Sequence, residues 1–300
     1  MEKVIVIVGP TGVGKTKLSI MLAKKYNGEI INADSMQVYK DLDIGTAKVT
    51  ELEKEGIIHH LLDIRDVTSD YSIFDYQKDC RSAIVDILSR GKTPIIVGGT
   101  GLYIKSALYD YKLVESKVNN DYADVSTEEL YNRLIKLDDK ASLSIDKNNR
   151  RRVINAINYY LANGKSISEN ITDKILYDAV FIGLTTDRDN LYDIINNRVD
   201  RMINEGLVDE VKSFYDKGMR TKPLIGGIGY KELYMYFDGM ISLTDAIELI
   251  KQNSRRYAKR QYTFFNNKMS INWFNTNYDH FENTFDEVCN FIEFNDKVNN

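Results

Sequence analysis

Buried strands and amphipathic helices alternate along much of the 300-residue chain. Continuous apolar runs without polar alternation are typical of strands that are covered on both faces of a parallel sheet. Such a run occurs at Val4 to Val8; further buried strands are predicted at Glu29 to Ala33, Thr93 to Val97 and lastly Ala179 to Leu184, with His60 to Ile64 as another candidate. Helical spacing of apolar residues marks Lys17 to Tyr26 and Ile73 to Ser89. This alternation predicts a doubly wound α/β fold, whose ligands bind at the carboxyl ends of the strands.

The alternation stops between about Asp110 and Tyr177, where the chain is polar and charged. Two helices are predicted there, Ser126 to Leu137 and Arg150 to Leu161, and Gly164 is expected to end the second. Further helices are predicted at Leu191 to Asn204, Val208 to Lys217 and Leu243 to Asn267. We therefore expect a discontinuous core domain, residues 1–110 and 178–300, that is interrupted by a small inserted helical domain, residues 111–177.

Composition gives weak limits on location and assembly. A hydrophobic content of 43% suffices for one large core. No run approaches the roughly 20 apolar residues that span a membrane, and a strand follows Met1 too closely for a signal peptide. We expect a cytoplasmic monomer, because no apolar stripe requires a partner. Cys80 and Cys289 are expected to be half-buried thiols rather than a disulfide.

Charge is distributed unevenly. The net charge of −4 argues weakly against a nucleic-acid partner. However, Lys147 to Arg152 reads KNNRRR, and Arg255 to Arg260 reads RRYAKR. In a helix, Arg255, Arg256, Lys259 and Arg260 share one side. A polyanion would meet these basic patches rather than the average charge, although solvated helix faces are the alternative explanation for each patch.

A phosphate-binding loop follows the first predicted strand. The segment GPTGVGKT comprises Gly9, Pro10, Thr11, Gly12, Val13, Gly14, Lys15 and Thr16, and it fits the pattern of Gly, four arbitrary residues, Gly, Lys, then Ser or Thr. Backbone N–H groups and the start of the next helix bind the phosphates of a ligand in such a loop. Lys15 supplies a charge, and the Thr16 hydroxyl can bind Mg²⁺. The loop does not reveal which polyphosphate it binds.

Two other strand ends carry candidate chemistry. Asp34 follows the second strand, where its carboxylate can accept a proton or bind Mg²⁺ through water; a turn cap made with Ser35 is the alternative. Gln37 has an amide that can pair with an adenine edge, although surface glutamines are common. Gly98 to Gly101 lets backbone approach a ligand and presents the Thr100 hydroxyl, or it is a plain turn. His59 and His60 are not expected to bind a metal, because neighbours on a strand point to opposite sides.

The order of these features resembles the tRNA dimethylallyltransferases of the bacterial type. The matching stretches reach from residue 4 to about residue 265: GPTGVGKT, INADSMQVYKDLDIGTAK, HHLLDI, VGGTGLYIKSAL, IGLTTDR, LYDIINNRVDRMINEGLVDEV, GGIGYKEL and RRYAKRQYTFF. The fold implied is a P-loop NTPase-like parallel sheet that is flanked by helices and carries an inserted helical domain.

The resemblance implies a reaction and its participants. The dimethylallyl group would pass from dimethylallyl diphosphate to N6 of the adenosine that follows the anticodon in tRNA, with Mg²⁺ as cofactor and diphosphate as leaving group. Asp34 would be the catalytic base, with Thr100 near the reacting centre. The phosphate loop would bind diphosphate together with Arg188 and Arg198. The tRNA would contact both catalytic residues and Ser35, Met36, Gln37, Arg151, Arg152, Arg256, Lys259 and Arg260.

The sequence departs from the family pattern in its insertion and near its end. The insertion is shorter than usual around SKVNNDYADVST. Its arginine motif ends in Asn155 instead of arginine, and Phe264 and Asn266 stand where Trp and Arg are frequent. These departures concern the grip on tRNA rather than the chemistry.

Three other functions fit parts of the sequence. They are an adenylate dimethylallyltransferase that acts on a free adenine nucleotide, a phosphate-loop kinase that transfers phosphate from ATP to a small molecule, and a non-catalytic RNA-binding protein.

Overall fold

The computed structural model describes residues 3–111, 113 and 122–299. The chain divides into two compact units, one formed by residues 1–105 and 177–300 and the other by residues 106–176. Each unit is described by itself. The start of the segment SKVNNDYADVST lies outside the described residues, and so does the expectation of a shortened insertion there.

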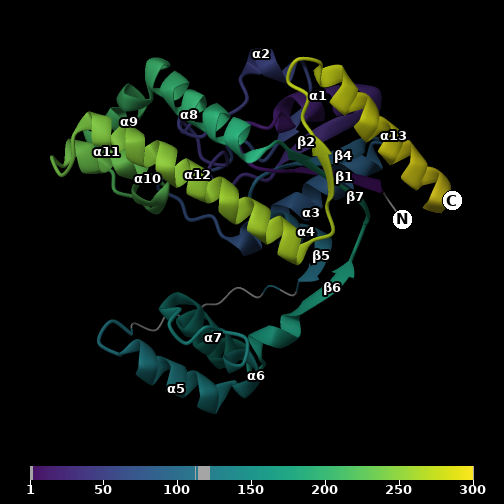
Figure 1. The fold of residues 1–300 in the computed structure, drawn as a ribbon. Coiled ribbons are helices and arrows are strands. Elements are labelled where there is room, and N and C mark those ends of the chain that lie inside the picture. Colours follow the sequence, from purple (N-terminus) through teal and green to yellow (C-terminus); the bar gives the residue numbers. More distant parts are fainter. Residues whose placement is uncertain (1–2, 112, 114–121, 300) are drawn as a thin grey trace. The chain divides into compact units, whose positions relative to one another are not determined.

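A six-stranded sheet forms the centre of the first unit (Figure 1). Its order is β3-β2-β4-β1-β7-β8 and every pair of neighbours is parallel. The strands are β1 (Lys3–Val8), β2 (Gly28–Asn32), β3 (His59–His60), β4 (Thr93–Gly98), β7 (Asp178–Thr185) and β8 (Asn272–Asn275). In β1, Ile5 pairs with Ile95 on one side and with Val180 on the other, and Val4 to Val8 are fully buried. The predicted α/β class is therefore confirmed.

Helices cover both faces of the sheet. The helix α1 (Lys15–Lys25) packs beside α13 (Phe281–Asn299), whereas α3 (Ile73–Ser89) lies against β2 and β4 on the opposite face (Figure 1). Right-handed crossovers explain this arrangement, because α1 connects strands in one direction along the sheet and α3 connects them in the other. The core between the sheet and the helices α1 and α13 includes Ile7, Leu18 and Ile292.

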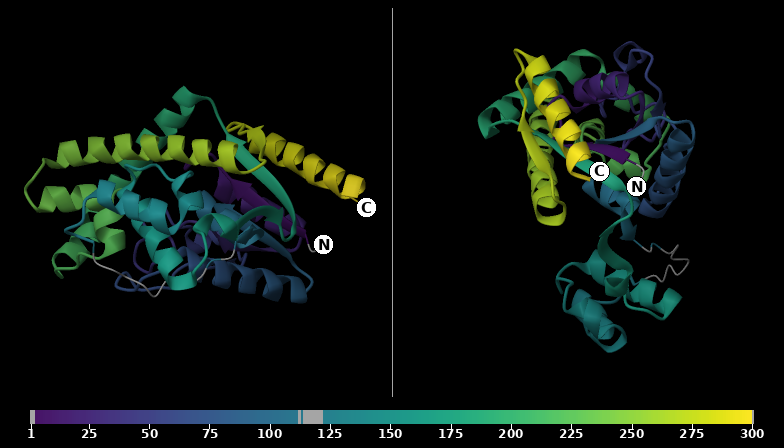
Figure 2. Two further views of the ribbon diagram at one scale, coloured as in Figure 1. Left: turned by 90° about the horizontal axis from the view of Figure 1, so that it is seen from below. Right: turned by 90° about the vertical axis from the view of Figure 1, so that its right-hand side faces the viewer.

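The remaining helices of this unit lie mostly between β7 and β8 in sequence. They are α8 (Arg188–Asn204), α9 (Leu207–Tyr215), α10 (Lys222–Gly226), α11 (Tyr230–Phe237) and α12 (Leu243–Lys268). Figure 2 shows α12 as a long, nearly straight helix. The short helix α2 (Glu51–Lys54) precedes β3, and α4 (Gly101–Leu108) follows β4 and enters the second unit.

The second unit is a small helical body with its own apolar core. It contains α5 (Thr127–Leu137), α6 (Asp139–Ser142), α7 (Arg150–Asn163) and the 3-10 helix η1 (Ile167–Asn170). Leu130, Leu134, Val153 and Ile157 meet in its core. The strands β5 (Tyr109–Tyr111) and β6 (Ile171–Ile175), which the sequence analysis did not predict, pair antiparallel. Gly164 ends α7 in a left-handed conformation, as predicted.

Three expectations need correction. The candidate strand at His60 to Ile64 is only His59–His60, because Leu61 and Asp63 have positive φ angles of 62° and 55° that no strand accommodates. The run Ala179 to Leu184 is not the last strand, since β8 pairs with β7 beyond it. Cys80 and Cys289 are free thiols, as expected, but they are buried rather than half-buried.

None of the helices found among residues 3–111, 113 and 122–299 combines the length and hydrophobicity that crossing a bilayer requires.

Candidate active site

Four neighbouring strands deliver the candidate chemistry to one edge of the sheet. The phosphate loop follows β1, Asp34 follows β2, Thr100 follows β4 and Arg188 follows β7. Because β2, β4, β1 and β7 are adjacent and parallel, their carboxyl ends lie at the same edge. This is where a doubly wound sheet binds its ligand.

The phosphate loop is shaped by close backbone contacts. Gly9 has a φ of 141°, and a Cβ there would lie 2.5 Å from the carbonyl oxygen of Leu184. Gly14, with a φ of 91°, is the N-cap residue of α1. It has no side chain that could accept hydrogen bonds from the first N–H groups of the helix. The Thr276 hydroxyl donates to the Val13 carbonyl at 2.8 Å and supports the loop from beneath. The loop therefore offers an anion site at a helix N-terminus.

Three charged side chains meet beside this loop. Lys15 Nζ donates to the Pro10 carbonyl at 2.6 Å. Burial lowers the pKa of Lys15 to about 7; Arg198 lowers it further and Asp34 opposes both. Burial also lowers the pKa of Arg198, which Asp34 again raises. Lys15, Arg198 and Asp34 are thus electrostatically coupled, as a site for an anion next to a base requires. The Thr16 residue is exposed at the start of α1.

The two carboxylate oxygens of Asp34 have different surroundings. Its Oδ1 accepts a hydrogen bond from the Met36 N–H at 2.8 Å, and its own N–H donates to Asn32 Oδ1 at 3.0 Å. The turn cap considered from sequence is therefore present. Among the residues that the structure describes, Asp34 Oδ2 has no hydrogen-bond partner, so this oxygen is available to a ligand while Oδ1 fixes the side chain.

Thr100 connects two of the strand ends. Its Oγ1 accepts from the Ser35 N–H at 3.1 Å and donates to Ser35 Oγ at 3.4 Å. The Thr100 N–H donates to the Ala33 carbonyl at 3.1 Å. A Cβ on Gly98 would collide with the backbone of Ala33. The segment is therefore more than a plain turn, because its glycine allows it to lie directly against the end of β2.

Two residues of α12 complete this corner, and the sequence analysis did not identify them. Gln261 is buried, and its Nε2 donates to the Gly99 carbonyl at 3.1 Å. A Cβ on Gly99 would collide with that amide. Burial raises the pKa of Tyr257 to about 12; Asp34 raises it further, whereas a hydrogen bond with Thr100 lowers it. The hydrogen bond with Thr100 and the electrostatic influence of Asp34 place Tyr257 near the site.

The Gln37 amide is already engaged within its own loop. Its Nε2 donates to the carbonyls of Thr46 at 3.1 Å and Ala47 at 3.3 Å. The NH₂ group that could pair with an adenine edge therefore has protein partners, and the side chain is half-buried. Ser35 and Met36 are also half-buried beside it.

Arg188 lies farther out than Arg198. It is exposed at the first residue of α8, and its Nε donates to the Tyr192 hydroxyl at 3.2 Å. The Arg188 guanidinium lies 5.2 Å from the Tyr192 ring centre, and that of Arg255 lies 5.9 Å from the same ring. Arg255 also donates to Asn196, which turns it toward α8. Tyr192 therefore gathers two guanidinium groups near the amino end of α8.

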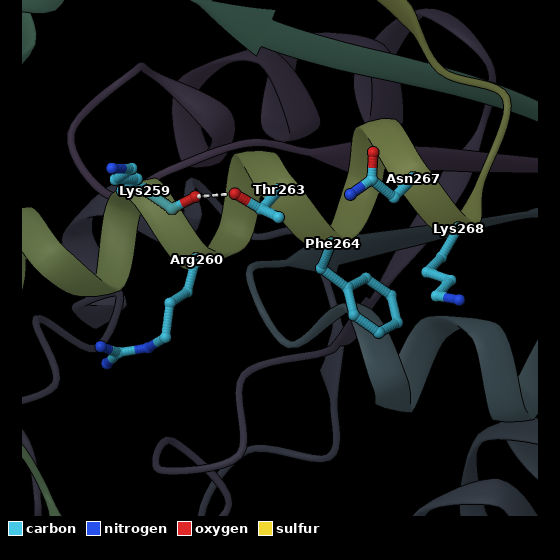
Figure 3. A pocket seen from close by; sticks show the side chains of 6 residues that line it. All are labelled: Lys259, Arg260, Thr263, Phe264, Asn267 and Lys268. Atoms are coloured by element: carbon cyan, nitrogen blue, oxygen red, sulfur yellow. Dashed lines mark hydrogen bonds between the residues drawn. The ribbon is translucent and has the colours of Figure 1, made fainter. Parts of the chain in front are cut away.

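The exposed face of α12 carries a groove of about 360 Å³ (Figure 3). It is lined by Lys259, Arg260, Thr263, Phe264, Asn267 and Lys268. Arg256, Lys259 and Arg260 are exposed, and the Arg260 guanidinium lies 5.6 Å from the Tyr257 ring centre. The lining of the groove thus combines three cations, Lys259, Arg260 and Lys268, with the aromatic ring of Phe264.

A second basic cluster belongs to the small unit. Arg151 and Arg152 are exposed in the first turn of α7, whereas Arg150 donates to the carbonyls of Val125 and Tyr122 at 2.6 and 2.5 Å. Cations at a helix N-terminus oppose the helix dipole. Arg151 and Arg152 therefore do not stabilise α7 by their charge.

His59 and His60 make structural contacts. His60 Nε2 lies 2.7 Å from Glu29 Oε2, and His59 Nδ1 lies 2.9 Å from the Ile57 carbonyl. Among the described residues, no cluster of three or more His, Cys, Asp or Glu side chains could hold a metal ion.

Comparison with known proteins identifies relatives of this chain. The family model described as IPP transferase matches residues 37–268. The tRNA dimethylallyltransferase of Anoxybacillus flavithermus is 52% identical over 300 residues, which cover 97% of this chain and 96% of that protein. The Bacillus subtilis enzyme of the same name is 52% identical over 284 residues, 91% of this chain and 90% of that protein.

Solved structures give the same result. The tRNA delta(2)-isopentenylpyrophosphate transferase of Staphylococcus epidermidis has a TM-score of 0.75 and 42% identity, with 98% of this chain and 99% of that chain covered. A eukaryotic dimethylallyltransferase acting on tRNA has a TM-score of 0.81 and 34% identity, with 92% of this chain and 74% of that chain covered. The chain belongs to the IPP transferase family of tRNA dimethylallyltransferases.

Proposed function

We propose that this chain transfers the dimethylallyl group from dimethylallyl diphosphate to N6 of the adenosine that follows the anticodon in tRNA. The bond between the allylic carbon and the diphosphate oxygen breaks, a carbon–nitrogen bond forms, and N6 loses one proton. The observation that carries this proposal is the coupling of Lys15, Arg198 and Asp34 beside the phosphate loop. Two cations serve a leaving diphosphate, and one carboxylate serves an attacking amine.

The loop binds the leaving group. Backbone N–H groups at the start of α1 and the Lys15 ammonium face the phosphates, and Arg198 adds a half-buried guanidinium. Negative charge that develops on diphosphate as the carbon–oxygen bond breaks is stabilised by these fixed donors. Arg188, which is exposed at the start of α8, is proposed to close on the diphosphate from outside.

Asp34 and Thr100 act on the acceptor. The exocyclic amine of adenine is a weak nucleophile, so a base that removes its proton speeds the attack. Asp34 is suited to this role because Met36 holds one carboxylate oxygen and leaves the other available. Thr100 fixes Ser35 and thereby the segment that borders the adenosine, Ser35 to Gln37.

Mg²⁺ is proposed to bind at this site together with the diphosphate. Mg²⁺ is commonly held by one or two protein groups together with substrate phosphates and waters. The exposed Thr16 at the end of the loop supplies one such hydroxyl, and no dedicated cluster of acidic ligands is found among the described residues. When bound, Mg²⁺ neutralises part of the charge on diphosphate.

The basic surfaces are proposed to bind the anticodon stem-loop. Arg256, Lys259 and Arg260 are exposed on α12, and Arg151 and Arg152 are exposed on α7. Cations of this kind serve RNA phosphates, and the target adenosine must leave its stack to reach Asp34. We further propose that the enzyme is cytoplasmic and works as a monomer; light scattering of the free protein tests the monomeric state.

A comparison of acceptors in separate reactions tests the function. The protein is given labelled dimethylallyl diphosphate and Mg²⁺ with an anticodon stem-loop, with AMP, or with a stem-loop whose target adenosine is replaced by guanosine. Label in the adenosine stem-loop alone is expected. Label in AMP alone would overturn the proposal, and a parallel reaction with labelled ATP that transferred phosphate would make the chain a kinase.

A further inference from the structure

The Glu210 carboxylate on α9 binds the backbone of a distant loop. Its Oε2 accepts from the N–H groups of Asp43 at 3.1 Å and Ile44 at 2.7 Å, and its Oε1 accepts from the Gly45 N–H at 3.1 Å. The Tyr230 hydroxyl donates to Oε1 at 2.6 Å. Three consecutive backbone N–H groups that converge on one anion form a strong, directional attachment.

This loop in turn holds the segment that borders the adenosine. Gln37 Nε2 donates to the carbonyls of Thr46 and Ala47, which directly follow the residues that Glu210 binds. Gln37 is three residues beyond Asp34, and Met36 supplies the N–H that fixes the Asp34 carboxylate. Glu210 and Gln37 are therefore linked by hydrogen bonds to the same backbone segment, residues 43–47.

The opposite side of the loop is held by Lys48. Its ammonium donates to the Tyr39 carbonyl at 2.8 Å, to Asp43 at 2.7 Å and to Asp63 at 2.5 Å. Ala47 has a φ of 43°, a strained conformation for a residue with a side chain. A strained conformation persists only where its surroundings enforce it, so the loop is built to hold one shape.

The helices α10 and α11 support the same segment. Tyr230 is fully buried, and a Cβ on Gly45 would lie 2.6 Å from its ring. A Cβ on Gly227 would lie 2.6 Å from Met36 Cε, so the side chain of Met36 rests on this turn. The buried Glu232 accepts from the Gly229 N–H at 2.8 Å and fixes the backbone that presents Tyr230. The stretch that contains Glu210 and the stretch GGIGYKEL therefore share the role of holding residues 43–47 and Met36 in place.

We propose that Glu210 is a positioning residue for the segment Asp34 to Gln37, acting through residues 43–47. This inference rests on the proposed function, because it assigns the segment to the adenosine acceptor. Glu210 fixes the acceptor side of the site, whereas the phosphate loop lies between β1 and α1; among the described residues, the hydrogen bonds of the Glu210 carboxylate go to residues 43–45 and Tyr230 and not to that loop. Loss of Glu210 therefore impairs use of the nucleic-acid substrate and leaves diphosphate binding intact.

Kinetics of full-length variants test the proposal. Glu210→Ala is expected to lower kcat/KM for an anticodon stem-loop by about 10²-fold, the scale of a misplacement of about 1 Å. The Kd of inorganic diphosphate, measured by calorimetry, should not change. Tyr230→Phe keeps the buried ring, removes one hydrogen bond to Glu210 and should give a smaller loss of the same kind. Asp209→Ala, on the exposed side of α9, is the matched control.

Hydrogen exchange supplies a readout that does not depend on turnover. The amides of Asp43, Ile44 and Gly45 should exchange faster in Glu210→Ala and, to a smaller degree, in Tyr230→Phe, but not in Asp209→Ala. Unchanged exchange, or a stem-loop kcat/KM equal to that of Asp209→Ala, overturns the proposal. So does a parallel loss of diphosphate affinity, which indicates general unfolding. If the wild-type protein prenylates AMP but no stem-loop, the proposed function is wrong. The role of Glu210 is then still decided by comparing kcat/KM for AMP between Glu210→Ala and Asp209→Ala.

Discussion

Lys15 donates a hydrogen bond from Nζ to the carbonyl of Pro10 at 2.6 Å, so the ammonium lies within the loop that it serves. Burial, aided by the nearby Arg198, lowers the pKa of this lysine to about 7. In the free protein, Lys15 is therefore expected to titrate near neutral pH. A bound phosphate favours the charged form and raises the pKa again.

Binding of diphosphate should therefore take up a proton at Lys15. Because the bound state holds more protons than the free state, affinity for diphosphate should fall as the pH rises above about 7. Calorimetry with inorganic diphosphate, between about pH 6 and about pH 9 in buffers of different ionisation heats, measures this uptake. Lys15→Arg stays charged throughout and leaves only the titration of the ligand itself. An identical uptake in wild type and Lys15→Arg would contradict the prediction.

Asp34 can be separated into its two roles by two substitutions. Asp34→Asn keeps an oxygen that accepts from Met36 but loses the base, whereas Asp34→Ala loses both. Each should reduce the single-turnover rate of prenyl transfer by about 10²–10⁴-fold, the usual contribution of a positioned base. Affinity for inorganic diphosphate should stay close to that of the wild type. If the single-turnover rate of Asp34→Asn matched that of the wild type while Asp34→Ala was slow, Asp34 would have a structural role only.

Glu29 contributes to stability at the opposite end of β2. It is 1% exposed, and its carboxylate accepts from Arg90 at 2.5 and 2.7 Å and from Lys92 at 2.8 Å. The hydrogen bonds from Arg90, and then those from Lys92 and His60, hold the pKa of Glu29 well below its ordinary value against the effect of burial. Glu29→Gln should lower the free energy of unfolding by about 1.5–3 kcal/mol at neutral pH.

The pH dependence of this loss has a definite sign. A carboxyl group whose pKa is depressed in the folded state makes its full contribution to the free energy of unfolding above its unfolded pKa, which is about 4.3 for glutamate. This contribution decreases as the pH falls below that value. The difference between wild type and Glu29→Gln, measured by urea unfolding, should therefore shrink from about pH 5 to about pH 3. Asp86→Asn is the control, because the exposed pair of Asp86 with Arg90 contributes at most about 1 kcal/mol. A constant difference across this range would exclude an ionised Glu29.

The sequence predicted the sheet well because buried parallel strands have a strong local signal. β1 and β7 contain long apolar runs, β2 and β4 contain shorter ones, and each strand lies where the sequence predicts it. β8 has only Trp273 and Phe274 between two asparagines, so its pattern is too short to read. The sequence analysis did not predict α10 and α11, which are short helices next to glycines. The five residues of α10 are too few to show helical periodicity, whereas Tyr230, Leu233 and Tyr234 of α11 do have helical spacing over a short stretch.

The site was predictable as far as it depends on strand ends. Lys15, Asp34 and Thr100 each follow a recognisable strand, and the parallel order of the sheet brings them together. Gln261 could not be found in this way, because its partner Gly99 is 162 residues away and a glutamine on a helix has no local signal of function. Glu210 and Gly45 are 165 residues apart and pose the same difficulty. Contacts of this kind follow from the packing of α9 and α12 rather than from any motif.

Arg152 offers a test in which binding and stability change in opposite directions. The side chain is exposed in the first turn of α7, and the N–H of this residue, not its guanidinium, donates to the N-cap Asn149. Arg152→Ala should therefore raise the stability of the small unit by about 0.3–1 kcal/mol, because it removes a cation from a helix N-terminus. It should also weaken binding of an anticodon stem-loop.

The salt dependence identifies the contact. Loss of one phosphate contact should reduce the slope of log Kd against log salt by about 0.7–0.9, measured by fluorescence anisotropy with a labelled stem-loop. Lys136→Ala, which removes an exposed cation in the last turn of α5, should leave the slope unchanged and slightly lower the stability. If both variants reduced the slope equally, the small unit would attract RNA through its general charge, and Arg152 would have no particular phosphate partner.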